Sequence, residues 1–296
     1  MRSDVVFPSA GLKLAGHLYR PDGVPRAAIV VGHPGGGVKE QAAGLYARRL
    51  VERGFVTLAF DAAYQGESEG EPRGLEDPGQ RVEDLKAAVS YLGTLDGVDP
   101  ERIGVLGICA SGGYALAATA TDPRIRAVAT VSAVDISRQF RLGADGGQDP
   151  AVVRGLLAAA AEARGADVQR FPIFPATEEE ARAGGPHVHE GWEYYCTPRA
   201  QHPRSAKSLT WSSVDRIAGF DAFSSLGLIA PRPVLLIAGR AAVTSWMSVE
   251  AYQKAYGDKE LAWIGGASHV DLYDRNEYVT PAVEKLSGFF AARLGV

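Results

Sequence analysis

Residues 99–117 read DPERIGVLGICASGGYALA, and this stretch decides the fold. A turn containing Pro100 leads into the apolar run 103–107, which is too short for a helix and has the composition of a buried strand. The chain then bends after Gly107 and enters a helix at about Gly112. A strand, a tight turn and a helix in immediate succession form the setting that a nucleophile elbow requires.

Cys109 lies at the turn of this elbow. Strand and helix approach each other closely there, so the residues two before and two after a nucleophile must be small, as Gly107 and Ser111 are. A competing register makes Ser111 the nucleophile, flanked by Cys109 and Gly113. Because the strand 103–107 is already complete and a glycine favours its end, we expect Cys109 to be the nucleophile. The alternative without catalysis is a small, buried, apolar cysteine.

A thiol suits this position chemically. The amino end of a helix and a neighbouring imidazole both lower the pKa of a cysteine and raise its thiolate fraction. We therefore expect Cys109 to be partly ionised near neutral pH.

An acyl-transfer site also needs donors for the oxyanion of a tetrahedral intermediate. The backbone N–H of Ala110, directly after the nucleophile, is one expected donor. The other is expected in the loop HPGGGVKE, which begins at His33 after an apolar strand. Its glycines let backbone N–H groups turn toward a developing negative charge, and we expect Gly35 and Gly36 to supply them.

His269 is the expected general base, because it alone of the six histidines follows the last predicted strand. An orienting acid is expected after the strand 232–239, yet no carboxylate appears there before Glu250. Asp135, after the preceding strand, is the first-ranked substitute, and Asp271 and Asp274 are close to His269 in sequence. A dyad of Cys109 and His269 without any acid is the remaining alternative, since a thiolate needs less help than an alkoxide.

The rest of the chain alternates short apolar runs with helical patterns, which predicts a mostly parallel, twisted sheet with helices on both faces. Residues 4–7 and 12–19 predict an antiparallel hairpin at an edge of that sheet. The predicted strands cover residues 27–32, 56–61, 102–107, 125–134, 232–239 and 261–266. The predicted helices cover residues 41–53, 79–91, 113–119, 248–255 and 281–294.

The alternation fails between residues 135 and 231, where an Ala-rich helix (150–164) precedes polar, aromatic and Pro-rich sequence. Such a length is unusual for a bare loop. We therefore expect residues 1–134 and 232–296 to form the core and residues 135–231 to form a helical cap. Ligands bind at the carboxyl edge of such sheets, so Trp192, Tyr194 and Tyr195 are expected to line the pocket.

Composition and charge narrow the classes of partner and cofactor. The formal net charge is −4, without a block of like charges, which excludes a nucleic-acid footprint or a polybasic membrane patch. Two cysteines are too few for a disulfide framework or a zinc site, and HVH (187–189) lacks a third ligand. No nucleotide motif is present, so we expect no organic cofactor and no metal. We expect a cytoplasmic protein with a small-molecule substrate, and a homodimer.

With these residues in hand, the chain resembles the α/β-hydrolase superfamily, and within it the dienelactone-hydrolase-like and YcjY-type (acetyl xylan esterase-related) proteins. The stretches that carry the likeness are FPSAGLKLAGHLYRP, VVGHPGGGVKEQ, TLAFDAAYQGESEGEPR, VDPERIGVLGICASGGYA, PRPVLLIAG and GASHVDLYD. The resemblance implies a cysteine in the elbow, which agrees with Cys109, and a base at His269. It also implies that His33, Tyr64 and Gln65 lie near the substrate. In that family the acid follows a strand end like AGSEADT, and its position is occupied here by Val243.

These features favour an esterase or lactonase that hydrolyses an ester, lactone or thioester of a small organic substrate through Cys109. The missing acid and the long cap favour a second hypothesis, a non-hydrolytic cyclase, acyl transferase or carbon–carbon bond enzyme. Val243 also motivates a third, a ligand-binding member of the family with impaired catalysis.

Overall fold

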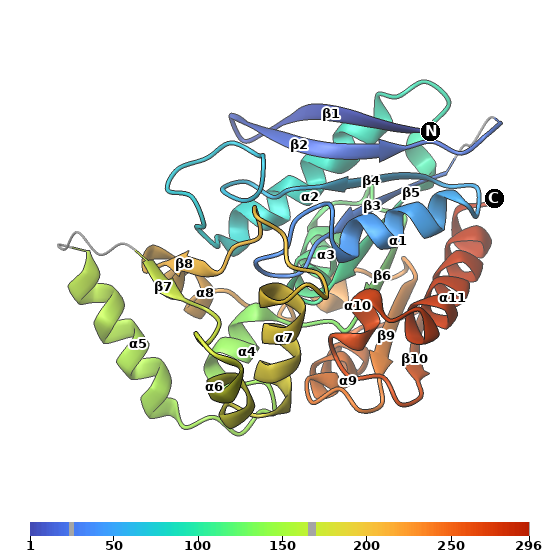
Figure 1. Cartoon of the computed structure of the whole chain (residues 1–296). Coiled ribbons are helices and arrows are strands. Elements are labelled where there is room, and N and C mark those ends of the chain that lie inside the picture. Colours follow the sequence, from blue (N-terminus) through green and yellow to red (C-terminus); the bar gives the residue numbers. More distant parts are fainter. Residues whose placement is uncertain (24–26, 165–169, 296) are drawn as a thin grey trace.

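A computed structural model of the chain describes residues 1–23, 27–164 and 170–295. Eight strands form one twisted sheet in the order β1-β2-β4-β3-β5-β6-β9-β10 (Figure 1). Six neighbouring strands of this sheet are parallel: β4, β3, β5, β6, β9 and β10. Strand β2 runs antiparallel to both β1 and β4. The bounds are β1 (Arg2–Ser9), β2 (Leu12–Tyr19), β3 (Ala28–Gly32), β4 (Val56–Phe60), β5 (Ile103–Ile108), β6 (Ala127–Val131), β9 (Val234–Gly239) and β10 (Lys259–Ile264).

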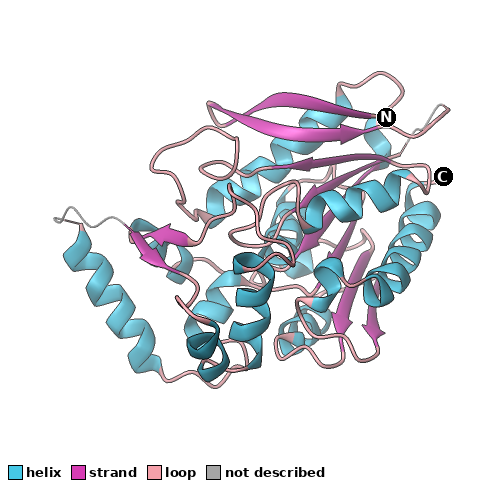
Figure 2. Ribbon diagram, in the orientation of Figure 1, coloured by secondary structure: helices cyan, strands magenta, loops and turns pink. Residues whose placement is uncertain are grey.

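Helices cover both faces of this sheet, as the alternating sequence pattern predicts (Figure 2). Side chains alternate along each strand, so Val105 packs into one apolar cluster and Leu106 into the other. The cluster of Val105 includes side chains of α2 (Pro78–Gly93), α3 (Ala110–Thr121) and α9 (Ser245–Lys254). The opposite cluster includes side chains of α1 (Ala42–Val51), α10 (Asp271–Asp274) and α11 (Asn276–Leu294).

The predicted hairpin lies at the edge of the sheet. β1 and β2 pair along their full lengths, from Arg2 opposite Tyr19 to Ser9 opposite Leu12. Ala10 and Gly11 form the turn, both with positive φ, 45° and 86°. Two consecutive positive φ angles match the right-handed twist of the strands, which explains the tight connection. β1 is longer than the predicted segment 4–7, because its outer face is largely exposed and carries little apolar signal.

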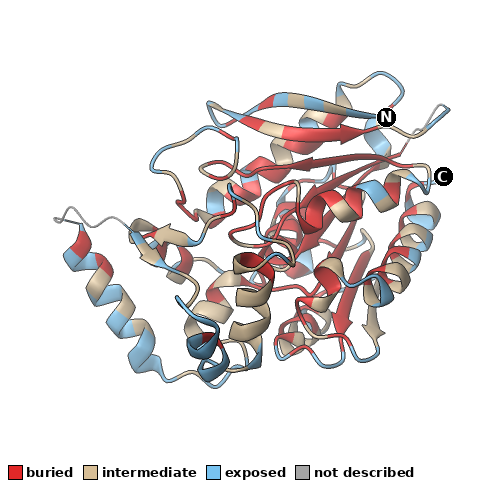
Figure 3. Cartoon of the chain, viewed as in Figure 1, coloured by how far each residue is buried: buried red, intermediate tan, exposed pale blue. Residues whose placement is uncertain are grey.

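The predicted insertion, residues 135–231, holds several short elements (Figure 1). β7 and β8 form a separate antiparallel pair that the sequence pattern did not reveal. Most residues of α5 are exposed or only partly buried (Figure 3). The elements are α4 (Ile136–Leu142), α5 (Pro150–Ala163), β7 (Arg170–Pro172), α6 (Glu178–Ala183), α7 (Pro186–Cys196), β8 (Ser208–Thr210), α8 (Ser212–Ala218) and a 3-10 turn (Leu226–Leu228).

Three of the predicted helices begin three or more residues earlier in the structure than in the sequence pattern, and one of them is α9, which begins at Ser245 rather than at residue 248. The helix after the elbow begins at Ala110 rather than at residue 113, so it follows Cys109 without a linker. The last helix begins at Asn276 and contains Pro281 in its interior. Within the described ranges, no helix is long and apolar enough to cross a bilayer.

The junction of β5 and α3 is so tight that it generates the first prediction. A Cβ atom placed on Gly107 would lie 2.0 Å from the carbonyl oxygen of Ser111. Gly107→Ala therefore forces the strand and the helix apart, and we expect it to lower the free energy of unfolding by about 1–3 kcal/mol. Urea denaturation followed by circular dichroism measures this change.

The matched control is Gly155→Ala in α5, where a Cβ meets no atom within 4 Å. Alanine suits a helix interior better than glycine, so this variant should be more stable than wild type by about 0.5–1 kcal/mol. Equal stability of Gly107→Ala and wild type would contradict the close approach of β5 and α3.

Candidate active site

Cys109 occupies the strained position between β5 and α3. Its φ of 55° and ψ of −120° lie in a region that non-glycine residues rarely adopt. Main-chain hydrogen bonds hold this conformation, from Cys109 N to Val131 O (3.0 Å) and from Val134 N to Cys109 O (2.9 Å). On the other side, Gly112 packs so closely that an added Cβ would lie 2.8 Å from Cα of Ala133. The turn is thus fixed by its small residues together with hydrogen bonds to the end of β6 and the loop that follows it.

Ser111, the competing nucleophile of the sequence analysis, lies inside α3 and is buried. Its hydroxyl donates to the carbonyl oxygen of His33 at 2.5 Å and accepts from Nη2 of Arg81 at 3.3 Å. Both contacts tie the helix to the loop after β3. The hydroxyl of Ser111 therefore makes structural hydrogen bonds, whereas Cys109 occupies the turn of the elbow.

Two backbone amides converge on the sulfur of Cys109. The N–H groups of Ala110 and Gly35 both lie within hydrogen-bonding reach of Sγ. These are two of the three expected oxyanion donors. Gly36 has another use: its carbonyl accepts from Ala206 N at 2.8 Å, and an added Cβ there would lie 2.9 Å from the Ala206 carbonyl oxygen. Gly36 joins the loop to the insertion.

A buried ionic cluster fixes the loop that carries Gly35. Nζ of Lys39 lies 2.8 Å from Oδ2 of Asp61 and 2.6 Å from Oε2 of Glu67. The backbone amide of Lys39 also donates to Oδ1 of Asp61 at 2.7 Å. Lys39 and Asp61 are almost fully buried, so the pair is desolvated and its geometry is well defined. The loops after β3 and β4 are thereby joined beside the elbow.

His33, an expected substrate contact, is a buried structural residue. Its Nδ1 donates to the Pro34 carbonyl at 2.7 Å, and its Nε2 accepts from Ala62 N at 3.1 Å and from Arg81 Nη1 at 2.9 Å. Burial and the charge of Arg81 hold the pKa of His33 well below its ordinary value, so the ring is neutral. Both nitrogens are occupied by the protein itself.

Tyr64 and Gln65, the other two expected substrate contacts, are engaged within their own loop. The side-chain amide of Gln65 donates to the carbonyl oxygen of Leu75 at 3.1 Å. The ring of Tyr64 lies against Gly70, where an added Cβ would be 2.4 Å from Cδ1. Together they shape the loop between β4 and α2.

His269, the expected base, follows β10 and is 1% exposed. Its Nε2 lies 2.9 Å from the hydroxyl of Tyr273, and its Nδ1 lies 2.6 Å from Oγ1 of Thr244. Burial, reinforced by His187, holds the pKa of His269 well below its ordinary value. The imidazole is therefore neutral, and a threonine hydroxyl stands where an acid was expected.

The structure does not bring Asp135 to His269. The carboxylate of Asp135 caps α4, accepting from Ser137 N at 2.9 Å, and its second oxygen accepts from Ala222 N at 3.0 Å. The expectation that Asp135 orients the base is corrected accordingly: helix capping takes up this side chain. An aspartate directly before a helix is a signal for an N-cap, and the sequence shows Asp135 in that position.

The other two candidate acids are also engaged elsewhere. Asp274 receives two hydrogen bonds from Arg199, at 2.9 and 2.7 Å. Asp271 accepts from Ser268 N at 3.1 Å, at the start of α10. Among the residues that the structure describes, the contact to Nδ1 of His269 comes from Thr244, directly after Val243.

The expected ionisation of Cys109 is also corrected. Burial raises the pKa of the thiol, although Tyr273, the amides of Ala110 and Gly35, and the charge of Arg81 oppose the shift. The helix end that favours a thiolate is visible in the sequence, whereas desolvation, which disfavours the charged form, depends on the packed fold. Thiol and imidazole are therefore both neutral at rest.

Helix α7 of the insertion reaches the site. The ring of His187 packs edge-on against His269, with centroids 5.0 Å apart, and its Nδ1 is 2.8 Å from Glu190. The hydroxyl of Tyr195 donates to the carbonyl oxygen of Gly35 at 3.2 Å. Tyr194 instead accepts from Ala42 N at 3.1 Å. Trp192 lies on the same helix and is half-buried.

Sequence reasoning missed two residues that contact the predicted base, Thr244 and Tyr273. Tyr273 follows His269 by four positions in a helical turn, which places the two side chains on one face. That spacing was readable. The contact of Thr244 was not, because it joins two separate loops.

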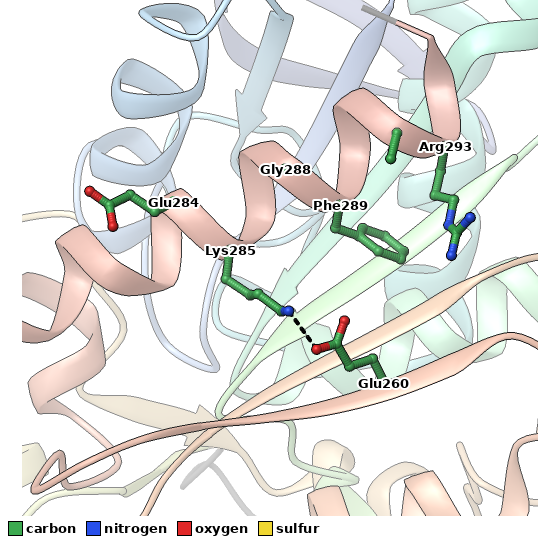
Figure 4. Close-up of a pocket in the computed structure, with 7 residues that line it drawn as sticks. Glu260, Glu284, Lys285, Gly288, Phe289 and Arg293 are labelled. Carbon is green, nitrogen blue, oxygen red and sulfur yellow. Dashed lines mark ion pairs between the residues drawn. The ribbon is translucent and has the colours of Figure 1, made fainter.

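The chain also holds a solvent-exposed groove between β10 and α11, apart from these residues. Figure 4 shows Glu260, Lys285 and Phe289 lining it, with Nζ of Lys285 2.5 Å from Glu260. In the described part of the chain, no cluster of three or more His, Cys, Asp or Glu side chains has the geometry to hold a metal ion.

The neutral thiol leads to a prediction about its reactivity. Because the folded pKa is raised, Cys109 should be mostly protonated at pH 7. Alkylation by iodoacetamide should then accelerate by about tenfold per pH unit from pH 6 to 8, since only the thiolate reacts. The measurement uses Cys196→Ser combined with His269→Ala, so that Cys109 is the sole thiol and no imidazole accepts its proton during alkylation. A rate that stays level over this range would contradict a thiol that is neutral at rest.

The chain is similar to a known enzyme family and to several bacterial proteins. The dienelactone hydrolase family model matches residues 14–139, which include Gly35 and Cys109. The uncharacterised protein YcjY of Escherichia coli is 44% identical over 271 residues, covering 90% of this chain and 89% of YcjY. PA2218 of Pseudomonas aeruginosa is 39% identical over 294 residues, covering 96% of this chain and 78% of PA2218. Its crystal structure superposes with a TM-score of 0.92 over 99% of this chain and 94% of that one.

Two fungal relatives carry named activities. The acyltransferase drtE of Aspergillus calidoustus is 26% identical over 94% of this chain and 91% of its own length. The thiohydrolase aneE of Aspergillus aculeatus is 39% identical over 44% of this chain and 41% of its own length. With the sheet order, the elbow and the long match to YcjY in agreement, the chain belongs to the dienelactone hydrolase family of α/β hydrolases.

Proposed function

We propose that the chain is an acyl hydrolase that attacks esters, lactones or thioesters of small organic molecules through Cys109. The observation that carries the proposal is the convergence of the Ala110 and Gly35 amides on Sγ in a strained turn. Strain is retained where function depends on it, and paired amides are the donors that an oxyanion needs. Membership of a hydrolase family supports the same reaction class.

The reaction follows from these groups. Sγ attacks the acyl carbon, and the thiol proton passes to Nε2 of His269. The carbonyl oxygen becomes an oxyanion held by the amides of Ala110 and Gly35. Collapse breaks the bond to the leaving oxygen or sulfur, which takes the proton from His269 and departs. Water then attacks the acyl carbon while His269 takes its proton. The C–S bond breaks, Sγ takes that proton back from His269, and the carboxylic acid is released.

Because thiol and imidazole are both neutral at rest, the proposed site stabilises charge mainly in the transition state of acylation. With the pKa of Cys109 raised and that of His269 lowered, an ion pair is disfavoured before substrate binds. As the C–S bond forms and the thiol loses its proton, negative charge develops on the carbonyl oxygen, beside the amides of Ala110 and Gly35. The site thus stabilises charge only in the transition state, which is where stabilisation raises the rate.

Helix α7 is the proposed cap over the substrate. Tyr195 contacts the carbonyl of Gly35 and His187 contacts His269, so α7 touches both the oxyanion loop and the base. We propose that Trp192, half-buried on the same helix, supplies an apolar wall. The small-molecule substrate, the cytoplasmic location and the homodimer stay predictions of the sequence.

Acyl transfer to an acceptor other than water is the second candidate. The observation in its favour is the burial of His269, which is 1% exposed and is covered by His187 of α7. We propose that this cover also keeps solvent water away from an acyl group on Cys109. The relative named as an acyltransferase points the same way. The two candidates share acylation of Cys109 and differ in what attacks afterwards.

Trapping the acyl-enzyme tests the proposal. After mixing with a phenyl thioester and acid quenching, intact mass should show one added acyl group on wild type and none on Cys109→Ala. Activity should fall by at least about a thousandfold in Cys109→Ala. Cys196→Ser, which removes the other free cysteine, should keep both adduct and turnover.

Turnover by Cys109→Ala at the wild-type rate would overturn the cysteine mechanism. An adduct that decays in buffer supports hydrolysis. An adduct that persists until a primary alcohol or thiol is added supports transfer instead.

A further inference from the structure

We propose that Tyr273 is a catalytic residue whose hydroxyl relays the proton from Sγ of Cys109 to Nε2 of His269. The proposal rests on the proposed cysteine mechanism and adds a participant to it. Tyr273 is buried, and its hydroxyl contacts both the nucleophile and the base.

The contacts place the phenol between the two groups. Its oxygen lies 2.9 Å from Nε2 of His269 and within hydrogen-bonding reach of Sγ of Cys109. Among the described residues, the imidazole nitrogens of His269 contact the hydroxyls of Tyr273 and Thr244, and Tyr273 is also the side-chain hydrogen-bond partner of Cys109. A base that meets its nucleophile through a hydroxyl needs that hydroxyl to conduct the proton.

Surrounding residues hold the phenol rigidly. Tyr273 lies in α10, and its amide donates to the carbonyl of Val270 at 2.9 Å. The ring packs edge-on against Tyr194, with centroids 5.2 Å apart. A side chain held by its helical turn and by this ring contact loses little entropy when its hydroxyl is kept in line.

The donor and the acceptor of each hydrogen bond in the series from Thr244 to Cys109 can be assigned consistently. Because His269 is neutral, one ring nitrogen donates and the other accepts. Nδ1–H donates to Oγ1 of Thr244, so Nε2 accepts from the hydroxyl of Tyr273. The phenolic oxygen in turn accepts from the S–H of Cys109. Every group in the series thus has one role, and the series ends at the attacking atom.

The proposed step balances without any co-reactant. As Sγ attacks the acyl carbon, the S–H bond breaks and that proton binds the Tyr273 oxygen. The original phenolic O–H bond breaks at the same time, and its proton binds Nε2 of His269. Tyr273 ends unchanged, with one proton moved from sulfur to nitrogen. Burial holds the pKa of Tyr273 well above its ordinary value, which favours a concerted transfer over a free phenolate.

The decisive comparison is Tyr273→Phe against Tyr46→Phe. Each deletes one buried phenolic oxygen, and the Tyr46 hydroxyl contacts the backbone beside Tyr273 without reaching Cys109 or His269. We expect Tyr273→Phe to slow single-turnover acylation by about a hundredfold at pH 7, with KM nearly unchanged. Tyr46→Phe should slow acylation by less than about threefold, since it disturbs only packing and one hydrogen bond.

The pH profile separates a relay from a merely structural role. Wild-type acylation should be level from pH 6 to 8, because His269 stays neutral throughout and takes the proton internally. In Tyr273→Phe the thiolate must form by loss of its proton to solvent, so acylation should rise by about tenfold per pH unit. A slowed variant with a level profile would overturn the relay, as would an unchanged rate.

A proton inventory on the wild-type protein tests the same idea without any variant. Two protons move together in the relay, so the acylation rate should fall along a curved line as deuterium oxide replaces water. A linear dependence overturns the relay. If Cys109→Ala is inactive and acyl-Cys109 forms while these tests fail, the proposed function stands and only the role of Tyr273 falls.

Discussion

The close approach of β5 and α3 at Cys109 is the constraint on which the rest of the site depends. Gly107 and Gly112 leave no room for a side chain on either side of the turn, and the positive φ of Cys109 follows from that geometry. The turn projects the sulfur toward the amides of Ala110 and Gly35. A longer or looser connection would lose the alignment of nucleophile and donors that acyl transfer requires.

Desolvation is the second constraint, and it decides the protonation state of the centre. Helix α7 and the helical turn of α10 pack around the buried His269, while the amide of Gly35 and the hydroxyl of Tyr273 lie beside the half-buried Cys109. Low polarity favours neutral thiol and neutral imidazole. In such surroundings a threonine is a sufficient partner for Nδ1, because no lasting imidazolium has to be stabilised by a carboxylate.

The sequence predicted what is local and missed what joins distant segments. Apolar runs and glycine spacing were sufficient for the parallel sheet, the edge hairpin and the turn at Cys109. His269 was proposed as the base because it follows the last predicted strand. Thr244 was missed because its contact with His269 depends on how two loops meet.

The prediction that Asp135 orients His269 was wrong. It rested on the position of Asp135 after a strand, whereas its carboxylate caps the helix that follows. The thiol pKa was misjudged for a related reason: the helix end is visible in the sequence, but burial emerges only from the packed fold. His33 and Gln65 were expected at the substrate, and they hold loops instead, because polar residues beside a site also satisfy its backbone.

The central claim is that the acyl group is carried by the sulfur of Cys109. Fragment-ion mass spectrometry of the tryptic peptide 103–124, taken after acid quenching with a thioester substrate, tests it most directly because this peptide contains both Cys109 and Ser111. The account predicts the added acyl mass on Cys109. An acyl group on Ser111, or elsewhere in the chain, would contradict it.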